Sequence, residues 1–308
     1  MTKCIVFPGQ GSQYLGMGKY LNENFDVSKR VFEEVDNALN QNLSKVIFGE
    51  DINKLNLTEN TQPAIMAVSI ATFEALKKEK DVHINNFNFC AGHSLGEYSA
   101  LVASECIKLS DAAKILKKRG QAMQNAVPVG EGGMAAVLNI DVNNLEKFIL
   151  EKKFQTIEIS NDNCPGQCVV SGEKKEIDKI IVLLKKELKK KSIPLPVSAP
   201  FHCQMMMPAA EELSNYIEDF HFSDPKIPLV SNVSAKAEKL NNEIKDLLIK
   251  CVYSRVKWKD TVEFFSNNKI SKAVECGPGK ALTNMFKRFE FEIKCLKVDV
   301  LEDIKNYE

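Results

Sequence analysis

The chain has 308 residues, 44% of them hydrophobic, and its 41 basic and 41 acidic side chains give a formal net charge of zero. This length and composition predict a globular protein with one large domain, or one large and one small. The zero net charge argues against bulk nucleic-acid binding, and the sequence lacks the run of about 18 apolar residues that a transmembrane helix needs. The amino terminus enters a strand-like run without signal-peptide architecture.

Nine cysteines are scattered along the sequence, and no C-x-x-C pair occurs among them. An odd number of scattered thiols is typical of a reducing compartment, where buried cysteines act as small apolar side chains. Only four histidines accompany them. We therefore expect no metal site.

The first part of the chain alternates strand and helix patterns, as α/β folds do. Apolar periodicity predicts a strand at 5–7, helices at 25–39 and 65–77, a strand at 87–91, and helices at 97–103 and 111–125. Pro63 marks the expected first turn of the second helix, and Ser110 is the expected N-cap of the last. A glycine-rich loop follows the first strand.

The pattern changes near residue 128. The sequence then predicts a strand at 134–138, a helix at 142–152, a strand at 156–160, a polar turn, a strand at 167–171, a helix at 174–190 and a strand at 192–197. This β-α-β-β-α-β order is ferredoxin-like. We therefore expect a small domain at 128–198, inserted into a large α/β domain made of 1–127 and 199–308. The last part carries expected helices at 204–218, 242–252, 261–267 and 280–286 and strands at 229–232 and 273–276.

The turn Gly92-His93-Ser94-Leu95-Gly96 carries the strongest chemical signal. It is a G-x-S-x-G pattern between an expected strand and an expected helix, which is the context of a nucleophile elbow. Glycines let the flanking backbones pass close to a serine held on a tight turn, and the helix N-terminus favours developing negative charge. Ser94 is therefore a candidate covalent nucleophile. The alternative is an ordinary turn with a capping serine.

A serine nucleophile needs a base and donors for the oxyanion. His202 follows an expected strand, where α/β folds place catalytic groups, and is the best base among the histidines, with a structural cap as the alternative. The Leu95 N–H and the loop around Gln10 are candidate oxyanion donors, although that loop could be a simple turn. Taken alone, Arg119 is expected at the surface, because arginine is rarely buried.

Short spaced motifs cover nearly the whole chain. They are Phe7-Pro8-Gly9-Gln10-Gly11-Ser12-Gln13, Thr61-Gln62-Pro63-Ala64, Gly92-His93-Ser94-Leu95-Gly96-Glu97-Tyr98, Arg119-Gly120-Gln121-Ala122-Met123, Gly133-Met134-Ala135-Ala136-Val137, Asn163-Cys164-Pro165-Gly166-Gln167, Pro200-Phe201-His202, Ser231-Asn232-Val233-Ser234-Ala235 and Glu275-Cys276-Gly277-Pro278-Gly279-Lys280. Together they resemble the malonyl-CoA:acyl carrier protein transacylase family of type II fatty acid synthesis. The motifs occur in the family's order.

The resemblance implies that Ser94 is the acylated residue and His202 its base, with Gln10 and the Leu95 N–H forming the oxyanion hole. It also implies that Arg119 pairs with the free carboxylate of malonate, which replaces the expectation of an exposed arginine. The fold it implies is an α/β-hydrolase-like large domain with an inserted ferredoxin-like small domain.

The resemblance further assigns substrate binding to Gln62, Asn163 and Phe201. It implies that His202 is oriented by a backbone carbonyl, here that of Cys251, where relatives often have glutamine. Four cations could dock an acidic carrier protein: Lys117, Lys118, Lys287 and Arg288.

The implied activity is ping-pong transfer of malonyl from malonyl-CoA to acyl carrier protein through a malonyl-serine intermediate. The carrier brings its own phosphopantetheine arm, so we expect no cofactor. We expect a monomer that binds neither nucleic acid nor membrane and acts in the cytoplasm, or alternatively in an organelle reached by a removed leader. Two other classes stay open: a hydrolase of esters or thioesters, and a non-catalytic carrier-binding protein.

Overall fold

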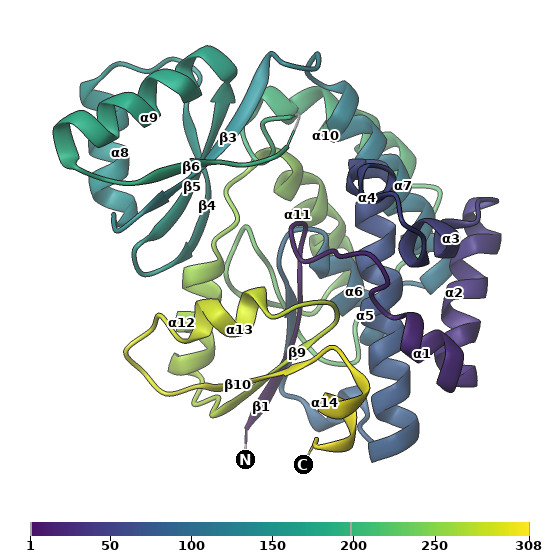
Figure 1. Ribbon diagram of the computed structural model, residues 1–308. Coiled ribbons are helices and arrows are strands. Elements are labelled where there is room, and N and C mark those ends of the chain that lie inside the picture. The colour runs from purple at the N-terminus through teal and green to yellow at the C-terminus, as the bar shows by residue number, and fades with distance from the viewer. Residues whose placement is uncertain (1, 198, 308) are drawn as a thin grey trace.

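The computed structural model describes residues 2–197 and 199–307, so the expected domain boundary at 198 and the terminal residues 1 and 308 lie outside the described residues. Two sheets organise the described chain, which confirms the mixed α/β class. The smaller sheet and its helices form a lobe at one end, and the start of β1 (Lys3–Phe7) and helix α14 (Leu301–Lys305) lie near each other at the opposite end (Figure 1).

The larger sheet has the order β10-β9-β1-β2-β7-β8, with parallel pairs except between β7 and β8. Its strands are β1 (Lys3–Phe7), β2 (Phe89–Gly92), β7 (Leu229–Val230), β8 (Ala237–Glu238), β9 (Lys272–Cys276) and β10 (Lys294–Val298). Ile5 and Phe7 enter one hydrophobic core and Cys4 and Val6 the other, since successive side chains of a strand point to opposite faces. Burial on both faces explains the continuous apolar run of β1.

Helices cover both faces of this sheet (Figure 1). They are α1 (Lys19–Asn24), α2 (Asp26–Leu39), α3 (Leu43–Phe48), α4 (Ile52–Asn56), α5 (Thr58–Lys80), α6 (Gly96–Ala103), α7 (Leu109–Asn125), α10 (Met207–Ile217), α11 (Asn241–Tyr253), α12 (Trp258–Asn267), α13 (Ala281–Phe286) and α14 (Leu301–Lys305), with short 3-10 turns η1 (Ile84–Asn86) and η2 (Gln204–Met206). The core on the Ile5 side is filled from α2, α5, α6 and α7, and the core on the Val6 side from α12 and α13. Within the described residues, none of these helices is both long and apolar enough to cross a membrane.

The smaller sheet is antiparallel and has the order β4-β5-β3-β6. Its elements follow in the chain as β3 (Gly132–Leu138), α8 (Val142–Glu151), β4 (Glu158–Cys164), β5 (Gln167–Glu173), α9 (Lys174–Leu188) and β6 (Ser192–Pro194). A separate apolar core joins this sheet to α8 and α9, which lie together on one of its faces (Figure 1).

Two helix starts differ from the sequence-based expectation. Helix α5 begins at Thr58 and carries Pro63 in its interior rather than in its first turn. Nearly all of its first two turns is buried, with Glu59 partly exposed, so tertiary packing outweighs the helix-breaking tendency of proline. Helix α7 begins at Leu109 after Lys108, and Ser110 lies inside the helix rather than at the N-cap. The buried Leu109 side chain belongs to the helix face that packs on the core.

The expected polar turn after residue 160 is also wrong. Strand β4 continues through Asn161 and Asp162 to Cys164, and the tight turn follows at Gly166, whose φ is 77°. These polar residues are buried because β4 pairs with β5 and also lies beside Val256, where the Asp162 N–H donates to the Val256 carbonyl at 3.0 Å. Polarity alone therefore suggested a loop where a buried strand exists.

Candidate active site

The nucleophile elbow expected from G-x-S-x-G is present between β2 and α6. Ser94 adopts a left-handed backbone conformation with φ 52°, half-buried at the turn. A Cβ on Gly92 would lie 1.9 Å from the carbonyl carbon of Gly96, and one on Gly96 would lie 2.4 Å from the Phe7 carbonyl oxygen. The backbones are thus so close that only glycine fits at both positions. Ser94 is thereby held at the end of a parallel strand, where its hydroxyl faces a cavity.

His202 lies directly against this serine. Its Nε2 is 2.8 Å from Ser94 Oγ, and its Nδ1 is 2.6 Å from the carbonyl oxygen of Cys251 on α11. A carbonyl only accepts, so Nδ1 carries the proton and Nε2 is left to accept the proton of the Ser94 hydroxyl. Burial and then the charge of Arg119 lower the pKa of His202 to about 3. The imidazole is therefore neutral at pH 7, as a general base must be.

Arg119 is buried, with 2% of its surface exposed, so the expectation from the residue alone is wrong. Its Nη2 donates to Ser94 Oγ at 3.1 Å and its Nη1 to the Gln62 side-chain oxygen at 2.8 Å. Gln62 comes from the buried face of α5, and α5 packs along α7. Within the described chain, Arg119 forms no ion pair with a carboxylate. A guanidinium fork therefore points at the serine without an ion-paired carboxylate.

The candidate oxyanion donors are two backbone N–H groups. The N–H of Leu95 and the N–H of Gln10 donate to no acceptor within residues 2–197 and 199–307. Leu95 precedes the first turn of α6, where the helix dipole favours negative charge. Gln10 lies in the loop after β1, which lines the same cavity.

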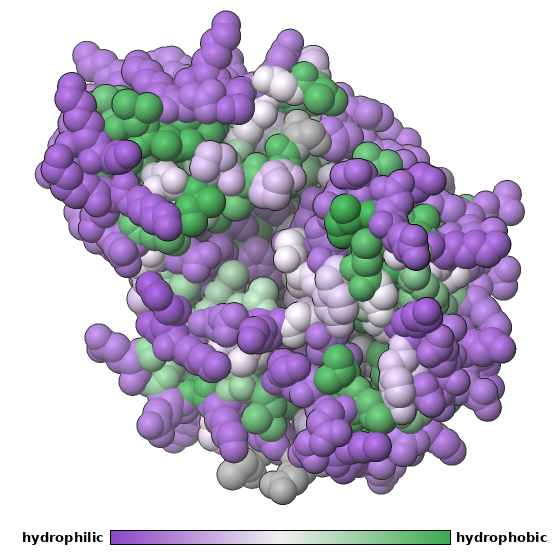
Figure 2. All heavy atoms as spheres, in the orientation of Figure 1, coloured by the Kyte–Doolittle hydropathy of each residue, from purple (hydrophilic) through white to green (hydrophobic). Residues whose placement is uncertain are grey.

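The cavity at Ser94 has a volume of about 250 Å³ and lies between the two lobes, where the molecular surface is hollowed (Figure 2). The large lobe lines it with the Gln10 loop, Ser94 and Arg119, and the small lobe with side chains of β3, β4 and β5. Asn163 and Phe201, both expected to contact substrate, line it as well. The side chains expected at the site from the sequence therefore line one cavity: Gln10, Gln62, Ser94, Arg119, Asn163, Phe201 and His202.

His93, the neighbour of Ser94, is turned away from the Ser94 hydroxyl. Its Nε2 lies 2.9 Å from the Asn163 side-chain oxygen, and its ring packs against Trp258 with centroids 5.6 Å apart. Burial lowers the pKa of His93. This ring joins the elbow to the small lobe through Asn163 and does not touch the Ser94 hydroxyl in the described structure.

Two buried residues beside the elbow were not assigned a role from the sequence. Asn232, after β7, contacts Ser94 and Gly92 through its side chain, and Glu97, on α6, accepts the backbone N–H of Asn232. Both stand within motifs that carry the family resemblance. Asn161 also lines the cavity, in the segment expected to be a turn.

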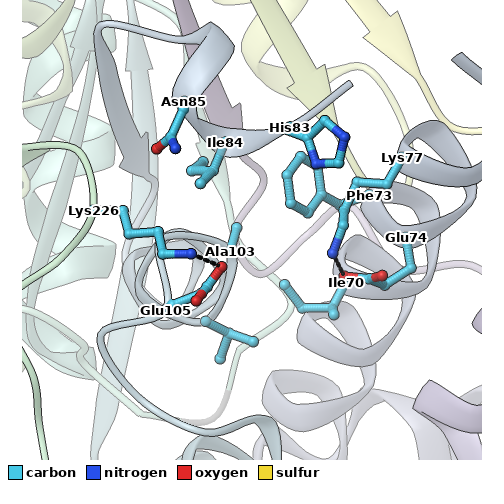
Figure 3. Close-up of a pocket in the computed structure, with 11 residues that line it drawn as sticks. Ile70, Phe73, Glu74, Lys77, His83, Ile84, Asn85, Ala103, Glu105 and Lys226 are labelled. Atoms are coloured by element: carbon cyan, nitrogen blue, oxygen red, sulfur yellow. Dashed lines mark hydrogen bonds and ion pairs between the residues drawn. The ribbon is translucent and has the colours of Figure 1, made fainter. Parts of the chain in front are cut away.

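A second cavity, of about 180 Å³, shares no lining residue with the first in the described structure (Figure 3). Lys226 points across it to Glu105 at 2.6 Å, and Lys77 pairs with Glu74 at 2.8 Å. Its charged groups are therefore already paired with each other.

Comparison with known proteins agrees with this geometry. The model of the acyl transferase domain family matches residues 4–282. A malonyl CoA-acyl carrier protein transacylase from Bacillus subtilis (strain 168) is 40% identical over 304 residues, covering 98% of this chain and 95% of the relative. A solved acyl-carrier-protein-S-malonyltransferase from Bartonella henselae superposes with a TM-score of 0.94 at 41% identity, covering 99% and 98% of the two chains.

A further solved structure is a malonyl-transacylase in complex with a type II PKS acyl-carrier protein. It is 34% identical, has a TM-score of 0.94, and covers 99% of this chain and 98% of that one. In each of these three comparisons the similarity extends over almost the whole length of both chains. The chain therefore belongs to the acyl transferase family, among its malonyl CoA-acyl carrier protein transacylases.

Proposed function

We propose that this protein transfers the malonyl group of malonyl-CoA to the phosphopantetheine thiol of acyl carrier protein, which supplies extender units for fatty acid synthesis. The names of its relatives support the reaction. The observation that carries it is the buried Arg119 guanidinium beside Ser94 Oγ. A fork of this kind suits an acyl group that ends in a free carboxylate.

The first half-reaction acylates Ser94. His202 Nε2 takes the hydroxyl proton as Oγ attacks the thioester carbonyl, and the oxyanion meets the N–H groups of Leu95 and Gln10. The C–S bond then breaks, and the protonated His202 gives its proton to the CoA thiolate. The product is a malonyl ester on Ser94, with its carboxylate on Arg119.

The second half-reaction reverses these roles. The carrier's thiol gives its proton to His202 and attacks the ester carbonyl. The C–O bond breaks, Ser94 Oγ takes the proton back, and the malonyl thioester leaves on the carrier. The Cys251 carbonyl holds the imidazole in one tautomer throughout, and the low pKa of His202 returns it to the neutral form between steps. Gln62, Asn163 and Phe201 complete the substrate surface in this proposal.

The finer architecture is part of the same proposal. The strand order of the small sheet and the chain order of its elements support a ferredoxin-like domain at 128–198. The parallel strands and the elbow support an α/β-hydrolase-like domain made of 1–127 and 199–308. We further propose that the protein acts as a monomer without nucleic acid or membrane. The bacterial relatives support action in the cytoplasm rather than in an organelle.

The carrier needs a basic docking surface, because carrier proteins are usually acidic. Of the four candidate cations, Lys117 pairs with Glu59 at 3.2 Å and Lys118 with Glu212 at 2.5 Å. Lys287 and Arg288 make no ion pair within the described chain and follow α13, which lines the cavity at Ser94. They are the better candidates for docking.

The test is intact mass measurement after incubation with malonyl-CoA, followed by addition of acyl carrier protein carrying its phosphopantetheine arm. We expect one malonyl adduct that maps to Ser94 and moves to the carrier when it is added. Free malonate as the main product at all times would mean a hydrolase. A protein that binds the carrier but never gains an adduct would be a non-catalytic carrier-binding protein.

A further inference from the structure

One side chain holds both sides of the elbow turn. The Oδ1 atom of Asn232 accepts the backbone N–H of Ser94 at 2.7 Å, and its Nδ2 donates to the Gly92 carbonyl at 2.6 Å. Asn232 is fully buried and comes from the loop after β7, 138 positions away from Ser94 in the chain. The left-handed conformation of Ser94 costs free energy for a residue with a side chain, so the surroundings must enforce it.

Asn232 is in turn held by Glu97. The Oε1 atom of this carboxyl accepts the backbone N–H of Asn232 at 2.8 Å, and Glu97 is 1% exposed. Glu97 lies in the first turn of α6, directly after the elbow. The contacts therefore close a ring that runs from Ser94 to Asn232, to Glu97, and back along the chain to Ser94.

Helix capping does not explain this buried carboxyl. Glu275 provides the contrast, since it is also buried but uses both oxygens to accept the N–H groups of Leu282 and Thr283 at 2.9 and 2.7 Å. Glu97 accepts one backbone N–H, at Oε1, and its Oε2 meets no donor within hydrogen-bond distance in the described structure. A buried carboxyl is costly, and Glu97 does not offset this cost by accepting the N–H groups of a helix end, as Glu275 does.

The surroundings of Glu97 act on its protonation and leave its contact with Asn232 intact. Burial raises the pKa of Glu97 to about 7, against the Asn232 N–H, the charge of Arg119 and the side chains of Cys251 and Ser231, which lower it. Oε1 can accept a hydrogen bond in the neutral and in the ionised carboxyl. Glu97 does not line the cavity at Ser94 in the described structure, so it has no route to the substrate itself.

We propose that Glu97 and Asn232 are positioning residues that hold Ser94 in its reactive conformation, with Glu97 acting through Asn232. The inference rests on the proposed role of Ser94 as the nucleophile. Without this support, the Ser94 backbone relaxes from its left-handed conformation and Oγ leaves the line to His202 Nε2. Ser94 then reacts more slowly with any electrophile, whether or not that electrophile carries a malonyl group.

The test measures how fast a fluorophosphonate probe labels Ser94. In this reaction Oγ bonds to phosphorus, the P–F bond breaks, and the hydroxyl proton passes to His202. Glu97→Met keeps the side-chain volume but removes the acceptor, and Asn232→Ala removes both contacts to the elbow. We expect each to slow labelling of folded protein by roughly ten- to a hundredfold, the range of one or two lost hydrogen bonds. Glu97→Gln keeps an acceptor oxygen and should stay within about threefold of wild type.

The double variant tests whether Glu97 acts through Asn232. We expect Glu97→Met with Asn232→Ala to label no more slowly than the slower single variant, because both changes break the same ring. Glu275→Gln is the matched control, a second buried carboxyl whose replacement should lower thermal stability and leave the labelling rate unchanged. A purely structural role of Glu97 would give the same pattern as this control.

Three results would overturn the inference: wild-type labelling of Asn232→Ala, fully additive losses in the double variant, or an equal loss in Glu275→Gln. If Glu97→Met does not fold, the labelling rate of Asn232→Ala decides alone. Failure of the proposed function would look different. Wild-type protein would then still be labelled by the fluorophosphonate but would gain no malonyl adduct.

Discussion

The cavity at Ser94 and the cavity of Figure 3 both contain charged side chains, yet these charges differ in what they touch. Around the second cavity, Lys226 pairs with Glu105 and Lys77 with Glu74, and all four side chains remain partly exposed. At Ser94, the buried Arg119 contacts only neutral partners among its described hydrogen bonds.

This difference indicates which cavity would bind an anionic ligand more tightly. An exposed ion pair is already satisfied and contributes little when it is broken or made. A buried guanidinium without a carboxylate partner gains a strong charge-assisted pair when an anion arrives. Two histidines show the same contrast. His83 is exposed and paired with the charged Asp81, whereas His202 is buried between a neutral hydroxyl and a neutral carbonyl. Substitutions in the two cavities should therefore have very different effects.

The largest effect is expected from Ser94→Ala. We expect the malonyl adduct to disappear and transfer to the carrier to fall by roughly a thousandfold or more, because the hydroxyl proposed to carry the malonyl group is gone. Intact mass and a transfer assay with labelled malonyl-CoA measure both. An adduct that persists at another residue would move the active site away from the elbow.

Arg119→Ala should separate acyl groups with a carboxylate from those without one. We expect malonyl transfer to fall by roughly a hundredfold and acetyl transfer by less than about fivefold, since only malonyl has a charge for the guanidinium to hold. The comparison uses kcat/KM for malonyl-CoA and acetyl-CoA with the same preparation. Equal losses for the two donors would show that Arg119 does not bind the carboxylate.

The low pKa of His202 predicts that the unfolding free energy of the protein decreases as the pH falls. The unfolded histidine takes up a proton as the pH falls below its ordinary value of about 6.5, whereas the buried one stays neutral down to about 3, so acidification favours the unfolded chain. Between pH 7 and pH 5, wild type should therefore lose about 2 kcal/mol more unfolding free energy than His202→Gln. Urea denaturation at both pH values measures the difference. Parallel losses in the two proteins would contradict the shifted pKa.

The smallest effect is expected in the second cavity. Lys226→Met removes one partner of an exposed ion pair, so we expect the unfolding free energy to change by less than about 1 kcal/mol. Malonyl transfer should stay within about twofold of wild type, because this cavity shares no residue with the site in the described structure. A clear loss of transfer would mean that the two cavities are coupled and would break the comparison.

Much of the fold could be predicted because its signals are local. The alternation of strands and helices, the order of the small sheet's elements and the elbow follow from periodicity and from the glycines around Ser94. The start of α5 could not be predicted, because burial by neighbouring helices outweighs Pro63. Asn161 and Asp162 suggested a turn because polar residues are typical of loops, whereas here they are buried between β5 and Val256, and Val256 lies far along the chain.

The candidate site divides in the same way. Ser94 is marked by its flanking glycines, and His202 by its place after a strand. No local sequence pattern indicated that Arg119 is buried, and only the family resemblance predicted that it faces the substrate. The Cys251 contact uses a backbone carbonyl, so no side-chain pattern could point to it.

The sequence by itself determined the class of fold, the family and the elbow, since each depends on residues close together or on motifs in a fixed order. Only the tertiary structure decided which groups surround the serine. Asn232 reaches Ser94 across 138 positions, and His202 reaches it across 108. Hydrogen bonds of this kind depend on how parallel strands bring distant loops to one edge of a sheet, and a one-dimensional pattern does not contain that geometry.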